Sequence, residues 1–216
     1  GQATDAILLP KVGLSWVVSE EKWFPQTSLL SSFRFRTAYG TTGRAPGAGA
    51  ALQTLQAAPY ASQVGTAIAT EAGAVPLNPG NKLLKPERGV EYEVGFDASL
   101  LSDRARVEFT YFHKTSLDLI LQPQLSPSLG FQANPFKNIG EVLNSGIEVG
   151  ITADMLRMKN FQWETRVNFN TLNNELVDLG EVAPFGTLNR FTEGFQMGSF
   201  VSKRIKNINT ATKVVT

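Results

Sequence analysis

The residue types of a hydrolytic site lie close together in the middle of the chain. His113, the only histidine, is followed by Ser116 and Asp118, and a serine, a histidine and an aspartate can together activate a nucleophile. Successive residues of an extended strand point to opposite faces, so Ser116 and Asp118 would point away from His113 in such a strand. We therefore predict that the chain is not an enzyme, and a hydrolase is the weakest of three hypotheses.

Groups that bind metals, cofactors or nucleic acids are also scarce. The 216 residues contain no cysteine, which excludes a disulfide framework, a thiolate metal site and a cysteine nucleophile, and the single histidine excludes a histidine-rich metal site. No carboxylate cluster has the spacing of a metal-binding loop, and no glycine-rich phosphate loop opens a helix. With 20 Lys and Arg against 19 Asp and Glu, the net charge of +1 gives no basic surplus. We expect no metal, no cofactor and no nucleic-acid partner.

Charged side chains recur at every second position in several segments, and their sign alternates from one segment to the next. Opposite charges on neighbouring strands stabilise cross-strand pairs, so the pattern predicts sequential antiparallel strands with a charged, water-facing wall. This wall either lines a path for solutes, without a simple preference for anions or cations, or is a structural charge ladder. The residues are Arg34, Arg36, Glu91, Glu93, Asp97, Arg104, Arg106 and Glu148.

Segments with an alternation of period two must position these charges. In one of them Tyr92, Val94 and Phe96 alternate with Glu91 and Glu93, which is typical of a strand with one apolar and one polar face. Helical spacing is poor, and no apolar run approaches the roughly 20 residues that a membrane-spanning helix needs. The predicted fold class is all-β, an antiparallel meander of about six long strands. The segments are residues 8–18, 33–40, 91–100, 104–111, 147–154 and 161–170.

Strand and connector lengths separate two all-β architectures. The segments run about 8 to 11 residues, whereas strands of soluble proteins have about 5 to 6 and tilted membrane-spanning strands need about 9 to 11. Short connectors (residues 19–29, 101–103 and 155–160) alternate with long ones (residues 42–87 and 116–139), as they do in outer-membrane barrels. We therefore expect part of a transmembrane β-barrel, with a soluble or surface-anchored β-sandwich binding module as the alternative.

Six strands cannot close such a barrel, because outer-membrane barrels have about eight strands or more and every backbone group in lipid must be paired. The chain also starts at Gly1, without an initiator methionine or a signal sequence. We therefore expect a fragment or a processed product that forms part of a barrel wall. The isolated piece would aggregate through its two unpaired edges.

Four motifs resemble segments of one known family. Residues 84–97, LKPERGVEYEVGFD, resemble a stretch found in the barrels of TonB-dependent outer-membrane receptors. Three further motifs resemble segments of the SusC/RagA-like branch of that family and follow its order. They are LPKVGLSWVVSEE (residues 9–21), FRTAYGTTG (residues 35–43) and NIGEVLNSGIE (residues 138–148).

The resemblance covers residues 8–200 and implies a barrel of about 22 strands in the lipid of the bacterial outer membrane. It implies import of a bulky nutrient (a glycan, a peptide or a chelated metal), driven by the inner-membrane TonB complex through a plug domain that these residues do not include. It also implies a SusD-type surface lipoprotein that lids the barrel. Residues 1–200 are then a receptor-like barrel segment, and residues 201–216 are a divergent or truncated tail.

Aromatic side chains gather near the short-connector ends of the predicted strands. Aromatic residues concentrate where a membrane meets water, so these residues predict an interfacial girdle on the periplasmic side. Stacking against sugar rings is the alternative role, but it would place the rings at the wrong end and on the wrong face. The residues are Trp16, Trp23, Phe24, Phe161 and Trp163.

The longest predicted connector has an unusual composition. Alanine and glycine make up about half of residues 44–75, so we expect a flexible outer loop or a short helix near residues 50–58. Binding residues often lie on loops that a rigid scaffold holds in place. This connector is therefore either a contact surface for the substrate or the lid protein, or a variable filler.

Overall fold

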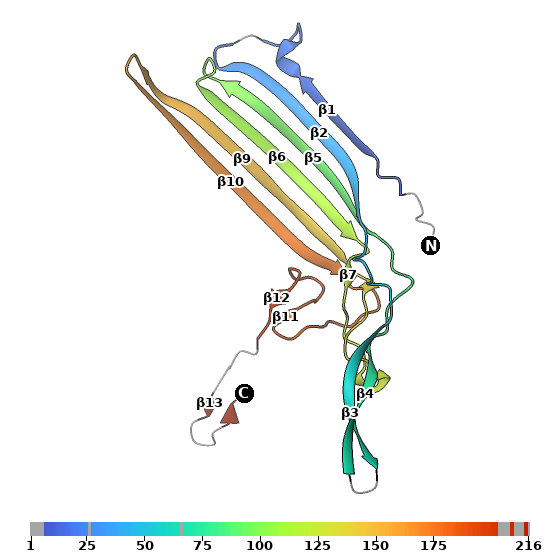
Figure 1. The fold of residues 1–216 in the computed structure, drawn as a ribbon. Coiled ribbons are helices and arrows are strands. Elements are labelled where there is room, and N and C mark those ends of the chain that lie inside the picture. The colour runs from blue at the N-terminus through green and yellow to red at the C-terminus, as the bar shows by residue number, and fades with distance from the viewer. Residues whose placement is uncertain (1–6, 26, 65–66, 203–207, 210–213, 216) are drawn as a thin grey trace.

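The computed structural model describes residues 7–25, 27–64, 67–202, 208–209 and 214–215. Its main element is one antiparallel sheet of six long strands, each hydrogen-bonded to the next long strand along the chain (Figure 1). The predicted all-β meander is confirmed. The strands, in their order across the sheet, are β1 (Lys11–Val17), β2 (Leu30–Arg44), β5 (Glu87–Leu100), β6 (Ala105–Leu117), β9 (Glu141–Met158) and β10 (Phe161–Asp178).

The connections between these strands lie at two opposite ends of the sheet (Figure 1). At the short-connection end, the 3-10 turn η1 (Val18–Glu20) follows β1, and residues 159–160 alone join β9 to β10. At the long-connection end lie residues 45–86, residues 118–140 and the segment that follows β10. Short and long connections alternate along the chain, as the sequence predicts.

Short elements occupy the long connections and the end of the chain. They are β3 (Thr54–Val64), β4 (Ala67–Asn78), β7 (Ile120–Leu121), η2 (Pro127–Leu129), β8 (Lys137–Asn138), β11 (Asn189–Arg190), β12 (Ser199–Phe200), β13 (Ile208–Asn209) and β14 (Val214–Val215). The predicted tail, residues 201–216, falls largely on residues 203–207, 210–213 and 216, which lie outside the described residues. Across the described ranges, no helix has the length and apolar character needed to cross a membrane.

The end of β9 differs from the prediction because the strand contains a β-bulge. The residues that pair with β10 jump from Asp154 to Leu156, which leaves Met155 as an extra residue on β9. The bulge returns Leu156 to the apolar face of the sheet. Because the alternation in the sequence breaks at this point, residues 155–160 were predicted as a connector, whereas only residues 159–160 connect the strands.

The long connection after β2 holds a hairpin instead of a helix. Of the two alternatives for this connection, a flexible loop or a short helix near residues 50–58, the helix is wrong: β3 and β4 pair with each other and project beyond the long-connection end of the sheet (Figure 1). Pro59 has no N–H group to continue a helix, which opposes the helical preference of the alanines. Across the hairpin, the Tyr60 hydroxyl donates to Glu71 Oε2 at 3.1 Å, a contact that only the paired strands provide.

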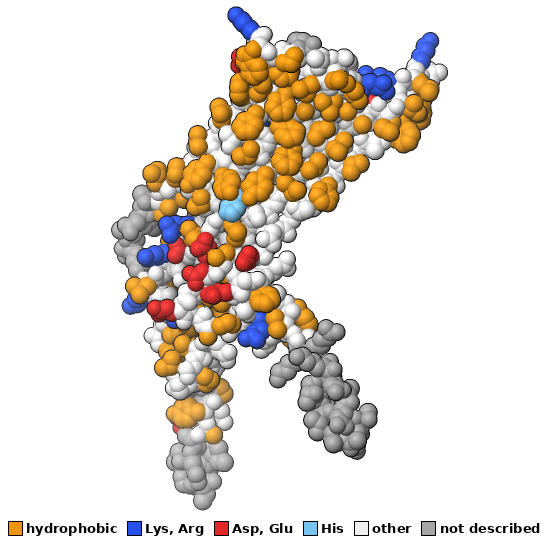
Figure 2. All heavy atoms as spheres, turned by 180° about the vertical axis from the view of Figure 1, so that it is seen from behind, with side chains coloured by type: hydrophobic (Ala, Val, Ile, Leu, Met, Phe, Trp, Pro, Cys, Tyr) orange, Lys and Arg blue, Asp and Glu red, His pale blue; other side chains and the backbone are white. Residues whose placement is uncertain are grey.

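One face of the sheet is apolar and largely uncovered. Figure 2 shows hydrophobic side chains over this face, with charged side chains gathered at the long-connection end and at the tips of the short turns. The rings of Phe33 and Phe96 stack with centroids 5.6 Å apart, and those of Phe96 and Phe109 lie 5.4 Å apart. Toward β10, Val167 and Phe169 remain 55% and 57% exposed. In the described structure the sheet is therefore one layer thick.

Apolar burial is concentrated at the long-connection end of β9 and β10. The buried cluster there consists of Val142, Leu176 and Leu179. The chain that follows β10 turns back over this cluster: the Leu176 N–H donates to the Phe195 carbonyl at 2.8 Å, and the Gly194 N–H donates to the Leu176 carbonyl at 2.9 Å. The segment that contains Gly194 and Phe195 thus lies along the outer edge of β10.

The close approach of the strands at Gly146 is testable by substitution in the full-length protein. A Cβ atom there would lie 2.0 Å from the Thr171 carbonyl oxygen and 2.8 Å from the Phe112 ring, so Gly146→Ala must separate β9 from its neighbours. We expect a loss of about 1–3 kcal/mol in the free energy of unfolding, measured by denaturant titration with tryptophan fluorescence. At Gly150 the nearest atom, Asn168 Oδ1, lies 3.5 Å away, so Gly150→Ala is the matched control. Equal losses for both variants would contradict this account of the packing.

Candidate functional site

Seven of the eight charged residues predicted to form a wall lie on one face of the sheet, opposite the apolar face. The exception is Arg104, which lies in the turn between β5 and β6 and donates to the Asp154 carbonyl at 3.3 Å. The alternation continues into this turn, which explains why Arg104 was predicted as a strand residue. We call the remaining set the polar wall: Arg34, Arg36, Glu91, Glu93, Asp97, Arg106 and Glu148.

Asp97 in β5 holds both arginines of β2. Arg34 Nε donates to Asp97 Oδ2 at 2.7 Å, and Arg36 Nη2 lies 2.9 Å from Asp97 Oδ1. Arg36 reaches Asp97 diagonally, because its partner in the register is Gly95, which has no side chain. Arg36 Nη2 also donates to Thr110 Oγ1 in β6 at 3.3 Å. One carboxylate therefore fixes two guanidinium groups that both keep part of their surface open to solvent.

The other members of the polar wall differ in how they are paired. Glu91 Oε2 lies 3.3 Å from Lys114 Nζ of the neighbouring strand. Within the described part of the chain, Glu93, Arg106 and Glu148 form no ion pair. Their donors and acceptors are therefore free to bind water or a solute.

Small residues open hollows in the polar wall. Gly95 contributes to a hollow that exposes Glu93. A second hollow lies between Glu148 and the amides of Asn168 and Asn170 in β10. These two asparagines are not predicted, because the charge pattern contains only charged residues, although their alternation with Val167 and Phe169 is visible in the sequence.

The predicted aromatic girdle residues lie at the short-connection end. The rings of Trp16 in β1 and Trp23 in the following connection meet edge to face, with centroids 6.3 Å apart. Trp16 Nε1 also donates to Glu21 Oε1 at 2.9 Å, so the indole has both an apolar contact and a polar partner. Phe161 and Trp163 lie at the start of β10, on the apolar face, and both remain exposed.

The structure does not bring together the residues of the hydrolase hypothesis, His113, Ser116 and Asp118. β6 continues through His113 and Ser116, which therefore point to opposite faces. The His113 ring stacks on Tyr92 with centroids 4.9 Å apart, and Asp118 Oδ2 lies 2.8 Å from Arg88 Nη2. Among the described residues, no group of three or more histidine, aspartate and glutamate side chains is placed to hold a metal ion.

Asparagine side chains tie the two long connections together. Asn138 Nδ2 donates to the Lys85 carbonyl and Asn138 Oδ1 accepts from the Lys85 N–H, both at 2.7 Å. Two of the motifs singled out in the sequence thus contact each other. Asn81 Nδ2 donates to the Phe136 carbonyl at 2.9 Å in the same way. We call this set the asparagine clamp: Asn78, Asn81 and Asn138.

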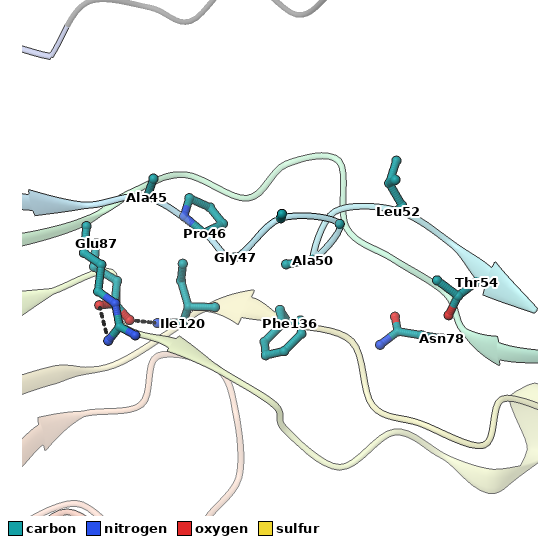
Figure 3. Close-up of a pocket in the computed structure, with 13 residues that line it drawn as sticks. Ala45, Pro46, Gly47, Ala50, Leu52, Thr54, Asn78, Glu87, Ile120 and Phe136 are labelled. Atoms are coloured by element: carbon teal, nitrogen blue, oxygen red, sulfur yellow. Dashed lines mark hydrogen bonds and ion pairs between the residues drawn. The ribbon is translucent and has the colours of Figure 1, made fainter.

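A cleft of about 500 Å³ opens beside the asparagine clamp (Figure 3). At the end of the cleft next to the six-stranded sheet, Arg44 Nη1 lies 3.9 Å from Glu87 Oε2, and the Ile120 N–H donates to Glu87 Oε1 at 2.9 Å. Neither alternation nor a motif predicts this cleft, because segments far apart in the sequence form it. We call it the outer cleft; it is lined by residues 44–50, Leu52, Thr54, Asn78, Glu87, Ile120 and Phe136.

The family model described as TonB dependent receptor-like, beta-barrel matches residues 1–207. The chain belongs to this family. Among its relatives, TonB-dependent receptor P3 of Formosa agariphila is 25% identical over 212 residues, and TonB-dependent receptor SusC of Bacteroides thetaiotaomicron is 26% identical over 181 residues. These matches cover 92% and 79% of this chain but 21% and 17% of the relatives. The chain thus spans about a fifth of the length of the curated relatives it matches.

Solved structures of the RagAB peptide importer share the fold of this TonB-dependent receptor barrel segment. The open-open state gives a TM-score of 0.74 at 20% identity and covers 95% of this chain and 23% of that chain. Another structure, of the RagAB peptide transporter, gives 0.70 at 20% identity and covers 88% and 20%. The predicted family is confirmed. Because barrels of this family sit in the bacterial outer membrane, the β-sandwich alternative is wrong.

The asparagine clamp can be tested in the full-length receptor. Asn138→Ala removes the acceptor of the Lys85 N–H, and a lost hydrogen bond of about 1.4 kcal/mol corresponds to about a tenfold change in a local opening equilibrium. We expect the Lys85 amide to exchange its hydrogen about tenfold faster, measured by hydrogen exchange with mass spectrometry. Asn170→Ala is the control, because this side chain forms no hydrogen bond within the described residues. Unchanged exchange at Lys85 in Asn138→Ala would show that the clamp does not hold the connections.

Proposed function

We propose that this chain is part of the wall of a receptor that imports a bulky nutrient across the outer membrane, and that it carries out no chemistry of its own. The observation that carries the proposal is a sheet one layer thick, with exposed apolar side chains on one face (Figure 2) and the polar wall on the other. In a membrane such a sheet is stable with its apolar face toward lipid and its polar face toward a water-filled interior. Membership of the TonB-dependent receptor family supports this arrangement.

The polar wall then lines the path of the nutrient. Arg34 and Arg36 offer exposed donors, and the unpaired carboxylates of Glu93 and Glu148 offer acceptors. Because both signs are present, the wall lets polar solutes exchange hydrogen bonds with it without favouring anions or cations. The energy for import is supplied by the TonB complex through a plug domain, and neither is part of these 216 residues.

The two ends of the sheet face different compartments in this proposal. Outer-membrane barrels have short turns on the periplasmic side and long loops outside. Trp16 and Trp23 at one edge of the sheet, and Phe161 and Trp163 at the other, then form part of the periplasmic aromatic girdle, with their rings in the lipid interface. The long-connection end, with the β3–β4 hairpin and the outer cleft, faces the exterior.

Partner and substrate follow from the same assignment. Resemblance to the SusC/RagA-like branch supports a SusD-type lipoprotein as the lid at the long-connection end. The similarity to SusC, and the fold shared with the RagAB peptide importer, leave a glycan, a peptide and a chelated metal as candidate nutrients. The lining of the outer loops, rather than the polar wall, would distinguish among them.

Import is tested with cells that carry the full-length receptor. Maltoheptaose, casein-derived peptides and ferric citrate, each isotopically labelled, are supplied to these cells, to a strain without the receptor and to a strain with an inactive TonB complex. We expect one of the three labels to accumulate about tenfold more in the first strain, because a bulky solute needs both the barrel and its energy supply. Equal accumulation in all strains, for every label, would contradict the proposal.

Cysteine labelling tests which face of the sheet meets lipid and which meets water. The method suits this chain because it contains no cysteine of its own. Glu93→Cys places a thiol on the polar wall, and Val94→Cys places one on the apolar face of the same strand. A charged, membrane-impermeant thiosulfonate should react at least about tenfold faster at position 93, since a thiol in lipid is shielded from a charged reagent. Asp103→Cys, in the turn after β5, controls for access to the reagent. Faster reaction at position 94 would reverse the assignment.

A further inference from the structure

We propose that the outer cleft binds the free carboxylate end of a short peptide with small apolar side chains, an inference that rests on the proposed import function. The cleft, with a volume of about 500 Å³, falls in the range of about 300–1,000 Å³ typical of small-molecule sites. It lies where a ligand from the exterior would first meet the chain. Its chemistry follows from two charged residues at one end, Arg44 and Glu87, and from two apolar walls.

Arg44 supplies the recognition of a carboxylate. Its side chain is 84% exposed, and its Nη1 atom lies 3.9 Å from Glu87 Oε2, at the outer limit of an ion pair. Glu87 is only 19% exposed, and its other oxygen accepts the Ile120 N–H at 2.9 Å. Most donors of the Arg44 guanidinium are therefore free, and their planar fork matches the two oxygens of a carboxylate.

The walls of the cleft fit small aliphatic groups. Pro46, Gly47 and Ala50 form one wall, and Ile120 and Phe136 lie across from them (Figure 3). These walls offer apolar contact but few side-chain hydrogen-bonding groups. The hydroxyl groups of a neutral glycan would lose water against these walls and find side-chain partners only at Thr54, Asn78 and the two charged residues, and the glycan brings no charge for Arg44. A peptide end with alanine-like side chains satisfies both the walls and the guanidinium.

The cleft lies at one end of the face that carries the polar wall. Arg44 occupies the same face of β2 as Arg34 and Arg36, because the three residues are separated by even numbers of positions. Between Arg44 and Arg36, the neighbouring strand β5 contributes Glu91 and Glu93 to this face. Recognition of a carboxylate in the cleft therefore rests on Arg44.

The carboxylate contact is tested with the full-length receptor in detergent by isothermal titration calorimetry. The probes are tetra-alanine with a free C-terminus, the same peptide with a C-terminal amide, and maltoheptaose. We expect the free acid to bind about tenfold more tightly than the amide, and Arg44→Gln to abolish this difference. Arg88→Gln is the matched control, because Arg88 directly follows Glu87 and pairs with Asp118 outside the cleft. Equal affinities of the acid and the amide for the unmodified receptor would overturn the proposal.

A second variant tests the cleft independently of its charge. A Cβ atom at Gly47 meets nothing within 4 Å, so Gly47→Trp fills the cleft without a backbone clash and should weaken both peptides about tenfold. Leu83→Trp, at an exposed position outside the cleft, should leave both affinities unchanged. Binding of maltoheptaose instead of the peptides, with TonB-dependent uptake intact, overturns only the assignment of the cleft. If cells with the full-length receptor show no TonB-dependent uptake of any labelled probe, the import function is overturned as well.

Discussion

The ladder of backbone hydrogen bonds between neighbouring strands is the interaction on which the rest of the structure depends. A single layer leaves few places for a packed core, and within the described residues the buried cluster of Val142, Leu176 and Leu179 lies at one end of the sheet. In lipid every N–H and C=O group must find its partner inside the protein, so the ladder is also what makes insertion possible. It fixes the two faces as well, because a slip of one residue would exchange all apolar and polar side chains. The bulge at Met155 meets this constraint, because one extra residue keeps the apolar face continuous to the end of β9.

Glycine residues shape the polar wall as much as charged residues do. Gly95 lets Arg36 cross to Asp97 and opens the hollow around Glu93, while Gly146 lets β9 approach the Thr171 carbonyl. The ion pairs hold neighbouring strands at defined positions, and the hollows leave unpaired groups facing the interior. Structural and transport roles of the charged residues are therefore compatible. The paired members order the wall, and the unpaired members remain available to a solute.

The long strands could be predicted because each one repeats the same two-residue pattern many times, as Tyr92, Val94 and Phe96 do in β5. Alternation is a local property, so it failed where a tertiary feature decides the structure. The asparagine clamp joins Asn81 to Phe136, and the outer cleft joins Arg44 to Ile120, which no spacing along the sequence specifies. The helix predicted near residues 50–58 followed local alanine content, whereas pairing with β4 decided the outcome. The family motifs were recognised correctly, but only the structure shows that Lys85 and Asn138, from two different motifs, contact each other.

The return of the chain onto β10 has a consequence for the outer edge of the sheet. Backbone hydrogen bonds join Gly194 and Phe195 to Leu176. The conformational entropy that the chain loses when the loop after β10 closes is therefore lost once, at this contact. Beyond this contact the chain turns away, since Ser199 and Phe200 pair with Arg190 and Asn189. The chain's own return thus covers the outer edge of β10 near Leu176, and a passing strand cannot pair with the edge at that point.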